Sequence, residues 1–291
     1  MPGLPDHHEP NASDDPPPAV PAPIAADASD DTYFDLLARA VRICARYKPK
    51  FGTGKADGLS LAEFQALYGA DPFYNWVGLN SPGMYAAHKA AGGMTSIYRQ
   101  LGIGCQWIFF NVLQNTLRLT PPQASWTYQV PTPTGKPRSL SLDGRIDLAD
   151  LTATNDKARL EEWMTNAASK LLLPHETRRQ LNGIVFEVRQ GYKSMDSKRQ
   201  NADIANAANA YSHRYMPVLV LLSTQIDANL IIRYTQAQWL LLVGTANGDP
   251  IHSTYSFCRE VLNYDLAGFF ERNSARIRAE LETVLTALLE G

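Results

Sequence analysis

The sequence predicts a mixed α/β (α+β) fold, in which helices flank a central mixed β-sheet and helical extensions lie at both ends of the chain. Helix-like and strand-like segments alternate after residue 32. Nearly unbroken aliphatic runs at 217–223 and 239–243 are typical of strands that are covered on both faces of a sheet. About 260 residues follow position 31, enough for a single domain over 32–291.

The first 31 residues are expected to form a disordered, acidic, proline-rich tail. They contain eight prolines and seven acidic residues, with no lysine, arginine or aromatic residue. Such a composition cannot bury enough apolar surface to offset the entropy lost on folding. The tail also lacks the basic start and apolar core of a secretory signal peptide.

The first part of the body is predicted to be helical. Apolar residues from Phe34 to Cys44 recur at helical spacing, which predicts a helix over 33–47. A short helix is expected over 60–68 and a longer one over about 94–118. Two glycines within the longer helix are expected to bend or interrupt it.

Two strands follow. Trp126 and Tyr128 alternate in a strand expected over 125–130, and a Pro/Gly turn leads into a second strand over 139–149. In the second strand the apolar residues share one parity, which indicates a face toward the core. The charged residues share the other parity: Asp143, Arg145 and Asp147.

The later elements complete the alternation of helices and strands. The segment from Gly183 to Lys193 contains an aliphatic run that predicts a buried strand. Helices are expected over about 155–172 and 195–211, on either side of this strand. The C-terminal stretch, 253–290, predicts two more helices.

Composition limits the class of protein. All 27 basic residues lie after position 31, where the net charge is about +5, compatible with nucleic-acid binding but also common among enzymes. No apolar run approaches the ~20 residues needed to span a bilayer, so no membrane partner is expected. Three well-separated cysteines indicate a reducing compartment and show no metal-binding spacing, which predicts a cytoplasmic protein.

Glu187 departs most from its local pattern, because it is an acid inside an aliphatic run. Burying a lone carboxylate costs on the order of several kcal/mol unless it is paired or bound to a cation. Strand alternation places Arg189 on the same face as Glu187. If the preceding hairpin lies beside this strand, Asp147 is expected to reach the same place. Carboxylates on rigid strands suit Mg²⁺, so Asp147 and Glu187 predict a magnesium site.

These residues carry a resemblance to a known family. An acid followed by an acid-x-cation strand, here Asp147 and then Glu187-Val188-Arg189, resembles the PD-(D/E)xK nuclease superfamily. The stretch 186–204, FEVRQGYKSMDSKRQNADI, looks like part of a type II restriction endonuclease, and more narrowly of the ApaLI-like family. The resemblance extends over about residues 92–271. It implies a restriction-endonuclease-like core, with the catalytic part at about 94–245.

The resemblance implies roles for individual residues. Asp147 and Glu187 would be the metal ligands, and the Val188 carbonyl would add a third. The usual lysine falls on Arg189, which is effectively always protonated and cannot act as a general base. Arg189 would then steer water or neutralise charge in the transition state, or Lys193 would fold back and take the role of the lysine. The implied cofactor is Mg²⁺, which would activate water for phosphodiester hydrolysis.

Three alternatives stay open around this site. Asp147 could form a structural salt bridge with Arg145 or Arg189. Asp143 could be the metal ligand in place of Asp147, because the two share a parity, although the glycine after Asp143 is typical of a turn. Gln106 lies where related nucleases often add an acid to the metal site. It cannot be an ionised ligand and is expected to pack or to hold water.

The resemblance also implies the partners. A homodimer would cut both strands of a short palindromic site in double-stranded DNA, such as GTGCAC, because two-fold sites are read by two-fold dimers. A cognate DNA methyltransferase would protect the host's own sites. The expected DNA contacts are Lys193, together with Lys198, Arg199 and Asn201 near a helix start that favours phosphate.

Two rival functions remain. One is a PD-(D/E)xK nuclease of DNA repair, which would cut at random or at junctions. The other is a catalytically silent DNA-binding protein, in which Glu187 and Arg189 form a buried pair.

Overall fold

The structure is a computed structural model that describes residues 30–51, 53, 55, 57–130, 138–191 and 197–290. The described chain divides into two compact units. The first comprises 41–100 together with the C-terminal residues from 279, and the second comprises 30–40 and 101–278.

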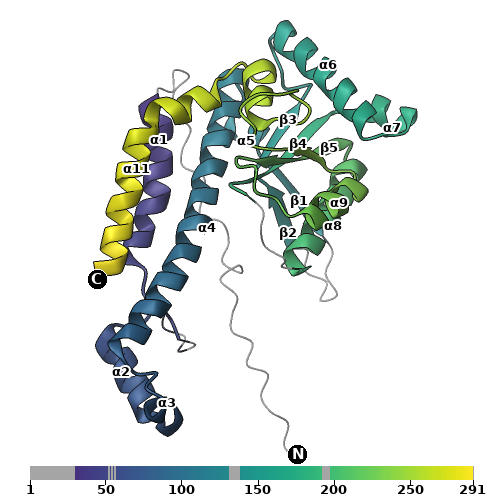
Figure 1. The fold of residues 1–291 in the computed structure, drawn as a ribbon. Coiled ribbons are helices and arrows are strands. Elements are labelled where there is room, and N and C mark those ends of the chain that lie inside the picture. The colour runs from purple at the N-terminus through teal and green to yellow at the C-terminus, as the bar shows by residue number, and fades with distance from the viewer. Residues whose placement is uncertain are drawn as a thin grey trace, which may run out of the picture. The chain divides into compact units, whose positions relative to one another are not determined.

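The helices and strands alternate much as expected (Figure 1). In chain order they are α1 (Asp30–Arg42), the 3₁₀-helix η1 (Ile43–Arg46), α2 (Leu61–Ala70), α3 (Pro72–Trp76), α4 (Pro82–Leu117), α5 (Pro121–Ala124), β1 (Trp126–Val130), β2 (Arg138–Leu142), β3 (Gly144–Asp147), α6 (Thr154–Lys170), α7 (His175–Gln180), β4 (Gly183–Arg189), α8 (Ser197–Ser212), β5 (Tyr215–Leu221), α9 (Ala228–Gln236), β6 (Leu240–Leu242), α10 (Thr254–Ser256), the π-helix η2 (Phe257–Val261) and α11 (Leu266–Glu290).

The second unit contains a four-stranded mixed sheet with the strand order β3-β4-β5-β6. β3 runs antiparallel to β4, whereas β4, β5 and β6 are parallel to one another. The parallel connections pass through α8 and α9, as parallel strands require a crossover. This confirms the predicted α+β class with a mixed sheet. β1 and β2 form a separate two-stranded antiparallel sheet.

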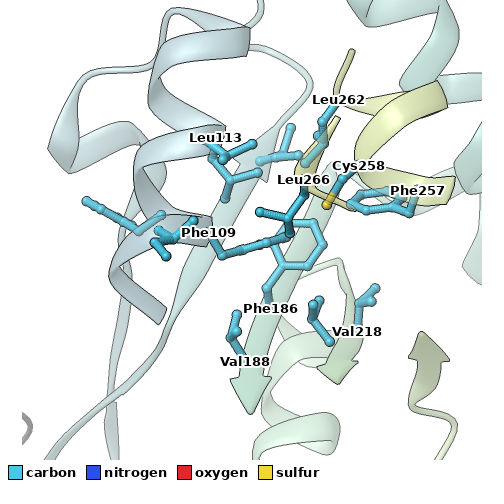
Figure 2. Close-up of a cluster of buried hydrophobic side chains, with 14 of the residues drawn as sticks. Phe109, Leu113, Phe186, Val188, Val218, Phe257, Cys258, Leu262 and Leu266 are labelled. Carbon is cyan, nitrogen blue, oxygen red and sulfur yellow. The ribbon is translucent and has the colours of Figure 1, made fainter. Parts of the chain in front are cut away.

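One face of the mixed sheet packs against α4 and the C-terminal helices. Phe186 lies at the centre of this layer, with its ring centroid 5.1 Å from that of Phe109 and 5.9 Å from that of Phe257 (Figure 2). Val188 and Val218 are fully buried beside it. Truncating a buried phenylalanine of this kind costs about 3–5 kcal/mol.

The opposite face is also covered. Val185 and Leu219 are fully buried there and pack in one cluster with Tyr234 of α9. Ala207 of α8 and Trp126 of the two-stranded sheet belong to the same cluster. Burial on both faces explains why β4 and β5 read as continuous apolar runs rather than as alternating ones.

Three expected boundaries differ in the structure. The strand expected over 139–149 is broken at Asp143, so that β2 and β3 belong to different sheets. α4 begins at Pro82 and continues through its glycines without interruption. A Cβ at Gly104 would lie 2.7 Å from Leu37 Cδ1, so this glycine serves close packing and not a break in the helix. The final two residues of the expected tail, Asp30 and Asp31, form the first turn of α1, and residues 1–29 lie outside the described chain.

The first unit is a small helical assembly with an aromatic centre. Phe51 packs against Phe64, with ring centroids 4.7 Å apart, and Ser60 caps α2 through a capping box with Glu63. Phe73 and Trp76 of α3 are largely exposed. In neither unit does a described helix combine the length and the apolar character needed to cross a bilayer.

Candidate functional site

Glu187 and Arg189 lie in the last three residues of β4, and both are almost completely buried. Their side chains form an ion pair, with Arg189 Nη2 2.9 Å from Glu187 Oε1. The expectation that the two side chains share one face of the strand is confirmed. The Arg189 guanidinium is therefore paired with the Glu187 carboxylate.

A second carboxylate, which the sequence did not single out, also contacts Arg189 Nη2. Asp203 of α8 accepts from Arg189 Nη2 at 2.8 and 3.0 Å through its two oxygens. The hydroxyl of Tyr234 donates to Asp203, and the indole Nε1 of Trp239 donates to the Asp203 carbonyl. Asp203 is 4% exposed, so this is a buried network of one arginine between two acids. Paired and hydrogen-bonded groups of this kind keep their charges inside a protein.

The acid beside the Glu187 strand is Asp143. Its backbone N–H donates to the Phe186 carbonyl at 2.8 Å, and its Oδ2 accepts the Val188 N–H at 2.7 Å. The Asp143 side chain thus continues the hydrogen bonding of β3 along the edge of β4. These contacts place its carboxylate against the peptide that joins Glu187 to Val188.

Gln106 of α4 completes this edge. Its Nε2 donates to Asp143 Oδ2 at 3.1 Å and to the Val188 carbonyl at 3.2 Å. Two acceptor oxygens therefore converge on one amide NH₂ group, whose hydrogens carry partial positive charge. The expectation that Gln106 packs or holds water is replaced by a more specific role, because it bridges the two oxygens directly.

The structure does not bring Asp147 to Glu187, which corrects the expected pairing. Asp147 is the register partner of Gly183, four residues before Glu187, a separation of about 13 Å along the strand. Its Oδ1 accepts the Ala149 N–H at 2.9 Å, and its Oδ2 accepts the Tyr215 hydroxyl at 2.5 Å. Burial and this hydrogen bond raise the pKa of Tyr215 to about 12. Asp147 is thus bound into the opposite end of the sheet.

Antiparallel pairing of β3 with β4 explains why Asp143, and not Asp147, lies near the end of β4. The start of β3 lies opposite the end of β4, so the earlier acid, Asp143, lies beside the end of β4 that carries Glu187, whereas Asp147 lies beside its start. Gly144 lets the start of β3 pack closely against α4, because a Cβ at that position would lie 2.9 Å from Leu113 Cδ1. The glycine that favoured a turn at Asp143 therefore marks the point where the chain leaves one sheet and enters the next.

The two arginines that could have formed a salt bridge with Asp147 pair with other acids. Arg145 pairs with Asp150 at 3.3 Å, and Arg189 pairs with Glu187 and Asp203. The Asp147 carboxylate accepts hydrogen bonds from the Tyr215 hydroxyl and the Ala149 N–H, and neither expected salt bridge is among its described contacts.

The remaining predicted residues are only partly placed. Lys193 lies outside the described residues. Lys198 and Arg199 lie in the first turn of α8, and their side chains are outside the described part of the structure. Asn201 is exposed, and its Oδ1 accepts from Arg233 of α9 at 3.1 Å. Their expected roles in DNA binding stay predictions.

The donor set suits a hard divalent cation. Asp143 and Glu187 supply carboxylate oxygens, and Val188 supplies a carbonyl oxygen within the same short stretch. Among the described residues no group of three or more His, Cys, Asp or Glu side chains gathers to hold a metal. Mg²⁺ is commonly bound by one or two carboxylates together with substrate phosphate, so two carboxylates and a carbonyl fit it.

Comparisons of the chain with protein-family models, with curated proteins and with solved structures find no match.

Proposed function

We propose that the protein is a Mg²⁺-dependent type II endonuclease of the PD-(D/E)xK kind, similar to the ApaLI-like family, which hydrolyses both strands of a short palindromic DNA site. The observation that carries the proposal is the convergence of Asp143, the Val188 carbonyl and Gln106 beside Glu187 at the edge of a mixed sheet. An acid, and then an acid-x-cation strand next to it, are the elements of that motif. Asp143 takes the place that the sequence assigned to Asp147.

The side chains have distinct tasks in this proposal. Asp143 and Glu187, with the Val188 carbonyl, would hold the cation, which when bound supplies Lewis acidity for the phosphodiester and for the attacking water. Arg189 positions Glu187 through the 2.9 Å ion pair and does not accept a proton, because a guanidinium stays protonated. Asp203 and Tyr234 hold Arg189 in turn.

Digestion of DNA tests this function. We expect purified protein with Mg²⁺ to cut unmethylated phage DNA into a sharp set of bands, with loss of the bands in EDTA and in the Glu187→Ala variant. Sequencing the fragment ends would give the site and show whether it is GTGCAC. Random or junction-only cutting would favour a repair nuclease instead, and intact DNA in all samples would contradict the proposal.

One observation favours a second candidate, a catalytically silent DNA-binding protein. The Glu187–Arg189 pair is buried and formed in the structure, as that rival requires. In this case the protein would bind duplex DNA without binding a divalent cation. Calorimetric titration with Mg²⁺ in the absence of DNA would separate the two candidates.

The bridging position of Gln106 leads to a prediction for the Gln106→Glu variant. In EDTA its melting temperature is expected to fall by roughly 5 °C, because a carboxylate replaces the donor to Asp143 and Val188 at a cost of about 2 kcal/mol. Mg²⁺ is expected to restore the loss, since a third carboxylate would face the cation and binding stabilises the folded state. Thermal unfolding with and without Mg²⁺ measures both effects.

A matched control is available in Gln123, whose Nε2 donates to Asp150 at 3.2 Å away from the site. Gln123→Glu also brings a carboxylate to an aspartate, where Arg145, 3.3 Å from Asp150, offsets part of the repulsion, and Mg²⁺ should not change its melting temperature. An equal Mg²⁺-induced shift in both variants would count against a cation site at Gln106.

A further inference from the structure

The densest run of positive charge in the chain lies in the N-terminal part, away from the proposed cation site in the sequence. Between Asp35 and Asp57 there are six basic residues and no acid. Four of the six line one cavity of about 820 Å³ within the first unit: Arg42, Arg46, Lys48 and Lys50. Asp57 contributes a carboxylate to its wall.

The walls of this basic cavity are held in place by the fold. Arg42 is fixed by Glu280 through two hydrogen bonds, of 2.6 and 2.7 Å. Pro49 is buried, and its carbonyl accepts the Leu59 N–H at 2.8 Å. Because neighbouring residues of an extended segment point in opposite directions, burial of Pro49 turns Lys48 and Lys50 outward together.

Like charges crowd this region. Lys89 of α4 is buried, and its pKa is lowered by burial and by the positive charge of Lys48. Repulsion between cations destabilises the fold unless an anion offsets it, so the first unit stores an unfavourable interaction that a bound anion would relieve. Together with the cavity, this indicates a site for a polyanion.

We infer that this basic cavity binds the backbone phosphates of duplex DNA. The inference rests on the proposed function only in taking DNA as the polyanion. The cavity is much larger than one phosphate and four cations line it, which suits contact with more than one phosphate. Arginine and lysine contacts to phosphate supply affinity and register without reading sequence. The site therefore adds strength, and not specificity, to DNA binding.

The test compares two triple variants of the full chain with the wild type. The first is Arg46→Gln, Lys48→Gln and Lys50→Gln, which leaves the Arg42–Glu280 pair intact. The control is Lys157→Gln, Lys170→Gln and Arg179→Gln on α6 and α7, which removes the same charge elsewhere. Fluorescence anisotropy with a labelled 20-base-pair duplex in EDTA, from about 50 to 200 mM salt, gives the affinity and its salt dependence.

The cavity variant is expected to bind at least about tenfold more weakly at low salt, with the slope of log K against log salt reduced by about 2 to 3, since each phosphate contact contributes about 0.9. The loss should be equal for any duplex sequence, and the control should match the wild type. An unchanged slope in the cavity variant, an equal loss in the control, or no duplex binding by the wild type would overturn the inference. Loss of adsorption to phosphatidylserine vesicles with unchanged DNA binding would overturn it in favour of a membrane surface.

These outcomes separate the cavity from the cation site, because the binding assay contains no metal. A protein that binds duplex DNA through the cavity but never cuts it would contradict the proposed function alone. A protein that cuts DNA while the cavity variant binds as the wild type does would contradict the inference alone.

Discussion

The Asp143→Asn variant is expected to lose DNA cleavage by at least about 10³-fold, equivalent to ~4 kcal/mol in the activation free energy. Asparagine keeps the size of the side chain and an oxygen for the Val188 N–H, but it removes the negative charge that a cation requires. The rate of plasmid nicking under single-turnover conditions, at saturating Mg²⁺, measures the loss.

The Asp147→Asn variant is the matched comparison. It changes an acid on the same strand segment, at the far end from Glu187, and it affects the hydrogen bond to Tyr215. Its cleavage rate is expected to stay within about threefold of the wild type, and the cost should appear as about 1 kcal/mol of stability. A loss of cleavage in Asp147→Asn with activity retained in Asp143→Asn would reinstate the pairing expected from the sequence.

The Asp203→Asn variant is expected to lose about 3 kcal/mol of stability, which lowers the melting temperature by on the order of 10 °C in a chain of this size. The reason is that Asp203 holds Arg189 through two contacts in a site that is almost closed to water. Removing one member of a buried ion network leaves the opposite charge poorly compensated. Thermal unfolding followed by circular dichroism in EDTA measures the effect without any contribution from a cation.

Two comparison variants test whether the loss of stability in Asp203→Asn arises because its ion pair is buried. Asp31→Asn breaks the Arg276–Asp31 pair, in which Asp31 is 75% exposed, and should cost less than about 1 kcal/mol. Tyr234→Phe removes the hydroxyl that donates to Asp203 and should give an intermediate loss. If Asp203→Asn melts within about 2 °C of the wild type, the network does not hold Arg189 as the structure indicates.

Much of the fold could be predicted because buried faces of helices and strands require apolar residues at regular spacing in the sequence. The unbroken aliphatic character of β5 and β6 follows from a sheet that is covered on both faces, and the single acid within β4 stands out as a departure from that pattern. The pairing of Glu187 with Arg189 could be predicted for a local reason, since alternate residues of a strand share a face.

The partners of these two residues could not be predicted in the same way, because they depend on contacts between distant elements. The alternation of residues 139–149 is the same whether they form one strand or two, so it does not reveal the change of sheet at Asp143. An antiparallel neighbour would have favoured Asp143 over Asp147, but strand direction is not visible in the pattern. Asp203 lies on a helix with many polar residues, so its sequence context does not distinguish it from a solvent-exposed acid.

The measurement that tests the cation site most directly is a titration of the wild-type protein with Mn²⁺, a spectroscopic substitute for Mg²⁺, followed by electron paramagnetic resonance in the absence of DNA. We expect saturable binding in the wild type and in Asp147→Asn, and an affinity at least about tenfold weaker in Asp143→Asn, equivalent to ~1.4 kcal/mol. Absence of Mn²⁺ binding in the wild type, or equal binding in Asp143→Asn, would contradict a cation site at Asp143 and Glu187.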